Sequence, residues 1–174
     1  TDNMLIVGCA GSTHIIRGDP LDGGQADVIS SSIGMVWGRP WAMDPFGNIY
    51  FFSNRCGIYS MDPRNGGQPQ RSSQAIDPIL QSIDTGENIV RMLWWDRTQS
   101  LHVFVTNLNQ PQANQHYCWE SRANAWFTDT FGNNNHNPLC CCVFDGNNPG
   151  DRVPLIGSWD GYVRAIHPAS TTDD

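Results

Sequence analysis

Short apolar runs separated by turn residues are the feature that most limits what this chain of 174 residues can fold into. The sequence holds 17 glycines, 11 prolines and fifteen asparagines, residues that favour turns for separate physical reasons. Its tryptophans, phenylalanines and tyrosines add bulk of the kind that favours strands. Many turns in a chain of this length require many short elements, so the sequence predicts an all-β fold.

Three of the runs are apolar at successive positions, in residues 49–52, 101–105 and 139–144. Neighbouring residues of a strand point to opposite faces of its sheet. We therefore expect these three strands to be buried on both faces. That pattern is typical of sheets stacked face to face, as in a propeller or a sandwich.

The runs group into repeating units, and we expect a β-propeller with about three full four-stranded blades and a partial one. The partial blade covers residues 1–21, and the full blades cover residues 33–61, 89–128 and 138–168. A helical spacer is expected over residues 72–84.

Within that spacer the pattern predicts one short helix near residues 75–83, because an apolar face recurs at helical spacing in Ile76, Ile79, Leu80 and Ile83. The chain does not begin with methionine, and we expect it to be a segment of a longer polypeptide. The total blade number and full length therefore stay open.

The charge of the chain argues against a protein that grips nucleic acid. Its net charge is −7, and all ten cationic residues are arginines. Binding to a phosphate backbone needs a basic surface. No run approaches the roughly 20 apolar residues of a membrane span, so we expect no membrane anchor.

The six cysteines are expected to be reduced residues of the core. Three of them are consecutive, and neighbours on a strand face opposite ways, which fits disulfide pairing poorly. No asparagine begins a glycosylation sequon. The cysteines are Cys9, Cys56, Cys118, Cys140, Cys141 and Cys142.

Four motifs invite a functional interpretation, and each is better explained as a turn or a core element. His136 and Cys140 do not supply the four convergent ligands of a zinc site. Residues 145–151 resemble the start of a calcium loop, but Pro149 and Ile156 stand where ligands are needed. Residues 17–19 spell Arg-Gly-Asp, and residues 158–162 resemble an Asp-box turn. The sequence thus predicts no catalytic, cofactor-binding or metal-binding residues and no cofactor.

Glycoside hydrolysis needs two carboxylates on either side of a sugar. The chain has two glutamates, Glu87 and Glu120, and nearly every aspartate sits in a turn context. Exposed tryptophans could stack on sugars, but strand alternation places Trp94, Trp119 and Trp126 between sheets. We therefore predict that the chain is not an enzyme, while a carbohydrate-binding or sialidase-like propeller stays an alternative.

Several short stretches resemble tailed-phage virion proteins with propeller folds, and the most similar group is the tail nozzle, or hub, proteins of podoviruses. The stretches are DVISSSIG (27–34), DPFGNIYFFS (44–53), GIY (57–59), NAW (124–126) and GSWDGYVR (157–164).

The resemblance implies a structural ring, typically hexameric, that contacts other tail or adaptor proteins and extends the DNA ejection channel. DNA would pass without specific binding, and the protein would be located in the virion, after assembly in the host cytoplasm. The loops 106–115 and 131–137 are candidate contacts. A receptor-binding tail protein is the form that the carbohydrate alternative would take in a phage, and a WD-type interaction propeller is a third, weaker possibility.

Overall fold

The computed structural model describes residues 4–110, 114–148 and 151–166 as an all-β protein with four separate sheets. The first sheet is antiparallel, in the order β1-β2-β3. Its strands are β1 (Met4–Gly8), β2 (Thr13–Arg17) and β3 (Gln25–Ser30).

The second sheet has the order β5-β6-β7-β8, and the third has β12-β11-β10-β9-β4. The second is built from β5 (Trp41–Met43), β6 (Ile49–Ser53), β7 (Gly57–Met61) and β8 (Gln70–Arg71). The third is built from β4 (Gly38–Arg39), β9 (Asn88–Trp95), β10 (Ser100–Asn107), β11 (Asn114–Glu120) and β12 (Ala125–Asp129).

The last sheet has the order β13-β14-β15, from β13 (Pro138–Phe144), β14 (Val153–Ser158) and β15 (Val163–Ala165). Helical structure is confined to single turns. These are η1 (Pro20–Asp22), η2 (Pro63–Asn65), η3 (Gln74–Ile76), α1 (Asp77–Leu80) and η4 (Asn134–His136).

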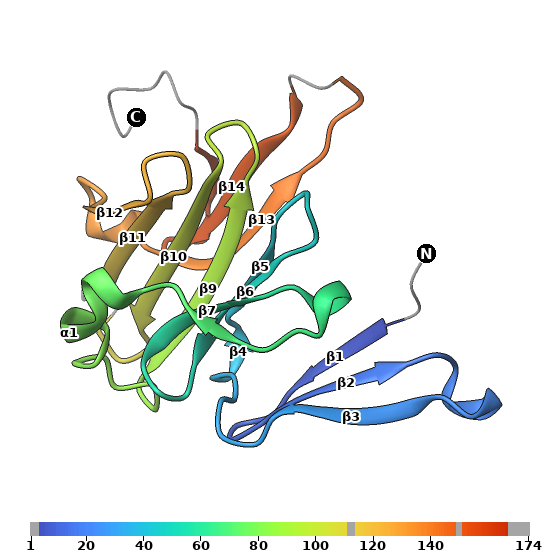
Figure 1. The fold of residues 1–174 in the computed structure, drawn as a ribbon. Coiled ribbons are helices and arrows are strands. Elements are labelled where there is room, and N and C mark those ends of the chain that lie inside the picture. Colours follow the sequence, from blue (N-terminus) through green and yellow to red (C-terminus); the bar gives the residue numbers. More distant parts are fainter. Residues whose placement is uncertain (1–3, 111–113, 149–150, 167–174) are drawn as a thin grey trace.

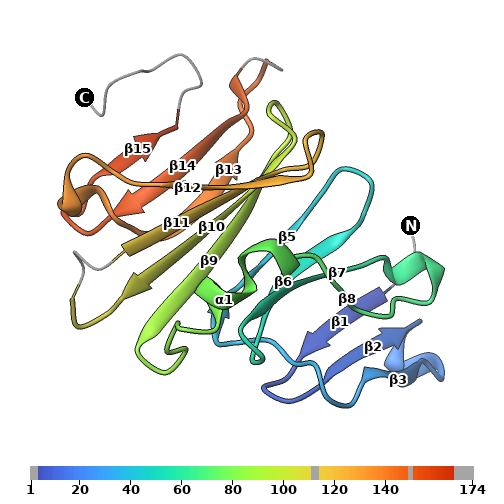
Figure 2. The same ribbon diagram turned by 60° about the vertical axis from the view of Figure 1, so that its left-hand side comes forward.

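The prediction of a β-propeller is wrong. The sheets hold three, four, five and three strands instead of a regular four, and the β1–β3 and β13–β15 sheets lie apart at two ends of the molecule (Figure 1 and Figure 2). The sheets therefore do not close into a ring within the described residues.

The departure from a four-strand repeat has a local cause at residues 33–39. At the start of the predicted blade 33–61, residues 33–37 form a single bridge, between Met35 and Ser53, instead of a strand. The chain then enters β4, which leaves the neighbouring strands and pairs in parallel with β9. Gly38 has a φ of 102°, a left-handed conformation that favours glycine. The fourth strand of the β5–β8 sheet comes instead from the two polar residues of β8.

The predicted helix is present but short. Ser73 precedes the single 3-10 turn η3, and α1 adds four residues with Pro78 in its first turn. Ile76, Leu80 and Ile83 point into the core, whereas Ile79 is exposed. The apolar face of the predicted helix is thus used, over a shorter helical segment.

The molecule is held together by three clusters of buried side chains, one at each junction between successive sheets. The largest lies between the β5–β8 and β9–β12 sheets and includes Phe52, Ile58, Leu80, Val103 and Val105. Smaller clusters join β1–β3 to β5–β8 around Ile15 and Phe51, and β9–β12 to β13–β15 around Phe104 and Ile156.

Of the three strands expected to be buried on both faces, β6 and β10 are buried in this way. Tyr50, Phe51 and Phe52 of β6 are buried, as are all residues from 100 to 106 in β10. The expectation is wrong for β13, in which Cys140, Cys142 and Phe144 are exposed. One face of β13 packs near β9, and no other described sheet covers its second face.

Candidate functional site

Two adjoining hollows lie beside the β5–β8 sheet: residues 48–70 line the first, and the segment after β8 together with β11 and β12 lines the second. Tyr50, Ser60 and Gln70 stand opposite one another on β6, β7 and β8, and consequently share one face of their sheet. Tyr50 packs from that face onto Trp94 of β9. The face is therefore the one turned toward the β9–β12 sheet.

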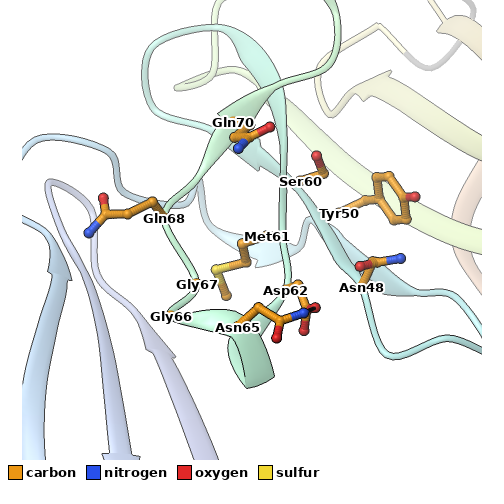
Figure 3. A pocket seen from close by; sticks show the side chains of 10 residues that line it. All are labelled: Asn48, Tyr50, Ser60, Met61, Asp62, Asn65, Gly66, Gly67, Gln68 and Gln70. Carbon is orange, nitrogen blue, oxygen red and sulfur yellow. Dashed lines mark hydrogen bonds between the residues drawn. The ribbon is translucent and has the colours of Figure 1, made fainter.

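The first hollow, the amide-rich pocket, has a volume of about 600 Å³. In Figure 3, Asn48 and Tyr50 lie on one side of it and Gln68 on the other. Most of its lining side chains carry an amide, a hydroxyl or a carboxylate. The lining is Asn48, Tyr50, Ser60, Met61, Asp62, Asn65, Gly66, Gly67, Gln68 and Gln70.

Hydrogen bonds fix the turns that border this pocket. Asp62 caps η2 by accepting from the backbone N–H of Arg64 at 3.0 Å and from the side chain of Asn65. Gly66 ends this turn with a φ of 85°. Asp44 accepts from the side-chain amide of Asn48 at 2.8 Å.

Several lining groups are therefore already committed inside the protein. Burial, followed by the nearby Asp44 carboxylate, raises the pKa of Tyr50 to about 12, so its hydroxyl keeps its proton. The side chains of Gln68 and Gln70 make no hydrogen bond to another described residue, and both residues are exposed. Their amides are the free donors and acceptors of this pocket.

The second hollow, the indole-lined pocket, has a volume of about 570 Å³. Trp119 of β11 and Trp126 of β12 are directly opposite in register, with ring centroids 6.3 Å apart. The polar part of the wall comes from the segment after β8 and from the β11–β12 turn. The lining is Arg71, Ser72, Gln74, Ala75, Trp119, Asn124 and Trp126.

Both indole N–H groups of this pocket are bonded within the protein. Trp119 donates to the Asn124 side-chain oxygen at 3.2 Å, and Trp126 donates to the Ser72 carbonyl at 3.3 Å. Behind Trp119 lies Tyr50, which stacks on Trp94 at 5.4 Å with an interplanar angle of 11°. The rings are thus held in place, and both tryptophans stay half-exposed.

A narrow ridge separates the two pockets. The Ser72 hydroxyl in the indole-lined pocket donates to the Ser60 hydroxyl in the amide-rich pocket at 2.8 Å. The ridge also carries the successive residues Gln70 and Arg71. The charge of Arg71 is matched within the protein, since its Nε lies 2.7 Å from Asp77 Oδ2.

A third hollow of about 430 Å³ is apolar and lies between β1 and β5. Leu5, Trp41 and Met43 contribute exposed apolar surface to it. It has no charged lining residue, so it offers no group for acid, base or nucleophilic chemistry.

The opposite face of the β9–β12 sheet carries a chain of buried polar side chains. Ser100 Oγ lies 2.6 Å from Thr98 Oγ1 and 3.0 Å from His102 Nε2. His102 Nδ1 lies 3.0 Å from His116 Nε2, and His116 Nδ1 lies 3.7 Å from an Asp129 carboxylate oxygen.

Burial is the main cause of the low basicity of this histidine pair. Desolvation lowers the pKa of His102 to about 3, aided by the neighbouring His116, and that of His116 to about 4. Ser100 is buried, so its hydroxyl is not presented to solvent. Sequence reasoning missed this pair, because the two histidines meet only through the register of the β10–β11 hairpin.

The motifs singled out in the sequence lie away from these pockets. In the Asp-box-like segment, Asp160 forms a two-pronged ion pair with Arg164, whose hydrogen bonds lower the pKa of Asp160 to about 2. The Arg-Gly-Asp segment is a turn, with Gly18 at a φ of 79° and Asp19 capping η1. Residues 149–150 of the calcium-like loop, 111–113 of the loop 106–115 and 167–168 of the last predicted blade lie outside the described residues.

The cysteines are free thiols, but most are not core residues. Cys141 is buried, Cys56 and Cys118 are half-buried, and Cys9, Cys140 and Cys142 are exposed. No group of three or more histidine, cysteine or acidic side chains suited to a metal ion occurs in the part of the chain that the structure describes. Within the same residues, no helix is long and apolar enough to span a membrane.

Comparison with solved structures gives a likeness of fold. No family model and no curated protein matches the chain. Among solved structures, the chain is similar to AofleA from Arthrobotrys oligospora, with a TM-score of 0.50 and 12% sequence identity. The alignment covers 99% of this chain and 63% of that chain, so this chain spans less than two thirds of AofleA. At this identity the likeness concerns the fold alone.

Proposed function

We propose that this chain binds carbohydrate and that the indole-lined pocket holds a sugar ring. The observation that carries the proposal is the pair Trp119 and Trp126 at the wall of an open pocket edged by polar groups. A sugar has faces of C–H groups, which pack on aromatic rings, and an edge of hydroxyls, which need hydrogen-bonding partners. Ser72, Gln74 and Asn124 supply such groups beside the rings.

The rigidity of the pocket supports binding. The indole N–H groups are already bonded, and the Tyr50–Trp94 stack supports Trp119 from behind. A ring that is fixed before the ligand arrives loses little conformational entropy on binding.

Binding fits the lining better than hydrolysis does. Cleavage of a glycosidic bond by the usual routes needs a pair of carboxylates. Asp62 is the one carboxylate in the described linings of the two pockets, and it is occupied in capping η2. These linings therefore support a protein that binds carbohydrate over one that hydrolyses it.

A glycan array identifies a ligand, and calorimetry then measures its affinity for variants of two neighbouring aromatic residues, Trp126 and Phe127. Trp126→Ala removes one wall of the pocket, whereas Phe127→Ala removes an exposed ring on the opposite face of the same strand. We expect Trp126→Ala to weaken binding by about tenfold or more and Phe127→Ala to leave it unchanged.

Trp126→Phe keeps an aromatic face without the N–H bond to Ser72 and should retain most of the affinity. Thermal melts of all three variants separate loss of binding from loss of folding. A wild-type protein that binds no glycan on the array, or equal losses in Trp126→Ala and Phe127→Ala, would overturn the proposal.

The tail nozzle function stays a prediction, together with its hexameric ring, its adaptor partners and its place in the virion. The supporting observations are those of the sequence, chiefly a net charge of −7 without lysine and the short stretches resembling podovirus nozzle proteins. Electron microscopy of intact virions with a labelled antibody tests it directly. Absence of the protein from virions would remove it without affecting carbohydrate binding.

A further inference from the structure

We infer that the ligand is a neutral oligosaccharide lying across both pockets, with one sugar on the indoles and the next among the amides. The inference rests on the proposed carbohydrate binding and deepens it. It assigns a second binding subsite to the amide-rich pocket of Figure 3.

The two pockets form one continuous surface. Their boundary is the Ser72–Ser60 hydrogen bond of 2.8 Å, with one serine in each lining. Tyr50, which lines one pocket, and Trp119, which lines the other, are in ring contact at 5.6 Å. A second sugar linked to one in the indole-lined pocket would therefore reach over this ridge into the amide-rich pocket.

The chemistry of the second pocket suits a sugar without an aromatic platform. Gln68 and Gln70 present amides that each offer donors and an acceptor, and hydroxyl groups need both. Both amides are free of other described partners, so binding costs no internal hydrogen bond. Each hydrogen bond made there adds to the affinity.

The charges of the linings favour a neutral ligand. Arg71 is the one cation in the described linings, and Asp77 already pairs with it at 2.7 Å. The amide-rich pocket contains the carboxylate of Asp62, and the whole chain carries a net charge of −7. A sialylated or sulfated sugar would meet like charge without an unpaired cation.

Titration calorimetry with a ladder of fragments tests the inference. The probes are the neutral glycan with the strongest array signal, its disaccharide and monosaccharide fragments, and its sialylated counterpart. We expect the affinity to rise about tenfold from the monosaccharide to the longer neutral fragments, as two added hydrogen bonds would give. The sialylated form should bind no better than the neutral one.

The double variant Gln68→Ala/Gln70→Ala should remove that rise and leave the affinity for the monosaccharide within about twofold. The matched control is Gln25→Ala/Gln81→Ala, which removes two exposed amides elsewhere and should change nothing. All four residues are exposed, so the variants should fold.

Equal affinities along the ladder, an undiminished rise in Gln68→Ala/Gln70→Ala, or tighter binding of the sialylated form would each overturn the second subsite. Monosaccharide binding that depends on Trp126 would then still support the proposed function. Absence of binding to every probe would instead contradict the proposed function itself.

Discussion

On the face of the β9–β12 sheet that meets β5–β8, the buried side chains are aliphatic or aromatic, as in Leu101, Val103 and Trp94. On the face that meets β13–β15, Ser100, His102 and His116 are buried beside Phe104. Alternate residues of β10 thus serve two different interiors. The first interior is stabilised by removal of apolar surface from water. The second also depends on hydrogen bonds between its buried polar groups.

The two faces should respond differently to substitution and to pH. An apolar interior is sensitive to lost volume and insensitive to pH. A buried histidine pair is sensitive to protonation, because a charge there has been removed from water.

The largest effect is expected from a cavity on the apolar face. Leu101 is fully buried, and Leu101→Ala should lower the free energy of unfolding by about 2–5 kcal/mol. Urea unfolding monitored by tryptophan fluorescence measures this change. Leu21→Ala, at a residue that is 94% exposed, is the control and should stay within about 0.5 kcal/mol of wild type. A Leu101→Ala protein as stable as the control would show that this face is not closely packed.

An effect of intermediate size is expected from acid on the histidine face. The unfolded histidines have a pKa near 6.5, whereas the folded pair has values of about 3 and 4, so the unfolded state binds more protons between these limits. Stability is therefore fully present above about pH 6.5 and falls as the pH drops, by about 1.4 kcal/mol per pH unit for each histidine. The Asp160 carboxylate, whose pKa is lowered to about 2, alters this pH dependence only below about pH 4, where its stabilising contribution is lost as the pH falls.

Urea unfolding at a series of pH values between 7 and 5 measures this slope. His116→Gln removes one of the two groups, so its slope should be about half that of wild type. An unchanged slope in this variant would contradict the account of the histidine pair.

The smallest effect is expected at the outer end of the polar chain. Asp129 is largely exposed, so Asp129→Asn should cost less than about 1 kcal/mol. The carboxylate also favours a proton on His116 Nδ1. His116 Nε2 then accepts a hydrogen bond from His102 Nδ1. His102 Nε2 in turn accepts one from the Ser100 hydroxyl.

Nitrogen-15 NMR of the imidazoles tests this arrangement. It should show both histidines protonated at Nδ1 in wild type, with a lower His102 pKa in Asp129→Asn, because the carboxylate raises that pKa. Protonation of His116 at Nε2 in the wild type would contradict the arrangement.

The sequence predicted the parts of the fold that depend on local pattern. Residues 49–52 and 101–105 were expected to be buried on both sides, and all of them are buried except Ile49, which is half-buried. The turn from Asp44 to Gly47 likewise depends on local sequence. Its glycine has a φ of 87°, and the Asp44 side chain accepts from the backbone of Phe46 and Asn48.

The parts that depend on partners distant in sequence were not predicted. Strands β4 and β8 have two residues each, and neither contains an apolar run. The strand β13 has the same apolar sequence pattern as β10 but has one covered face, which no local signal reveals.

The candidate site was partly predictable. Trp119 and Trp126 were expected between sheets, and they lie there with part of each ring exposed. The amides of Gln68 and Gln70 belong to no motif, and the register of β8 alone places Gln70 beside Ser60. The ridge between Ser60 and Ser72 likewise exists only in the folded chain.

The short strand β4 has a consequence for the order in which the molecule assembles. It precedes the β5–β8 sheet in the chain yet pairs with β9, which follows that sheet. This pairing closes a loop of about fifty residues that contains the whole β5–β8 sheet. Closing such a loop costs conformational entropy, and the two residue pairs of β4 and β9 stabilise the fold only after that cost is offset. Folding of the β5–β8 sheet shortens this loop first. We therefore expect β4 to pair with β9 late in folding, after the β5–β8 sheet has formed.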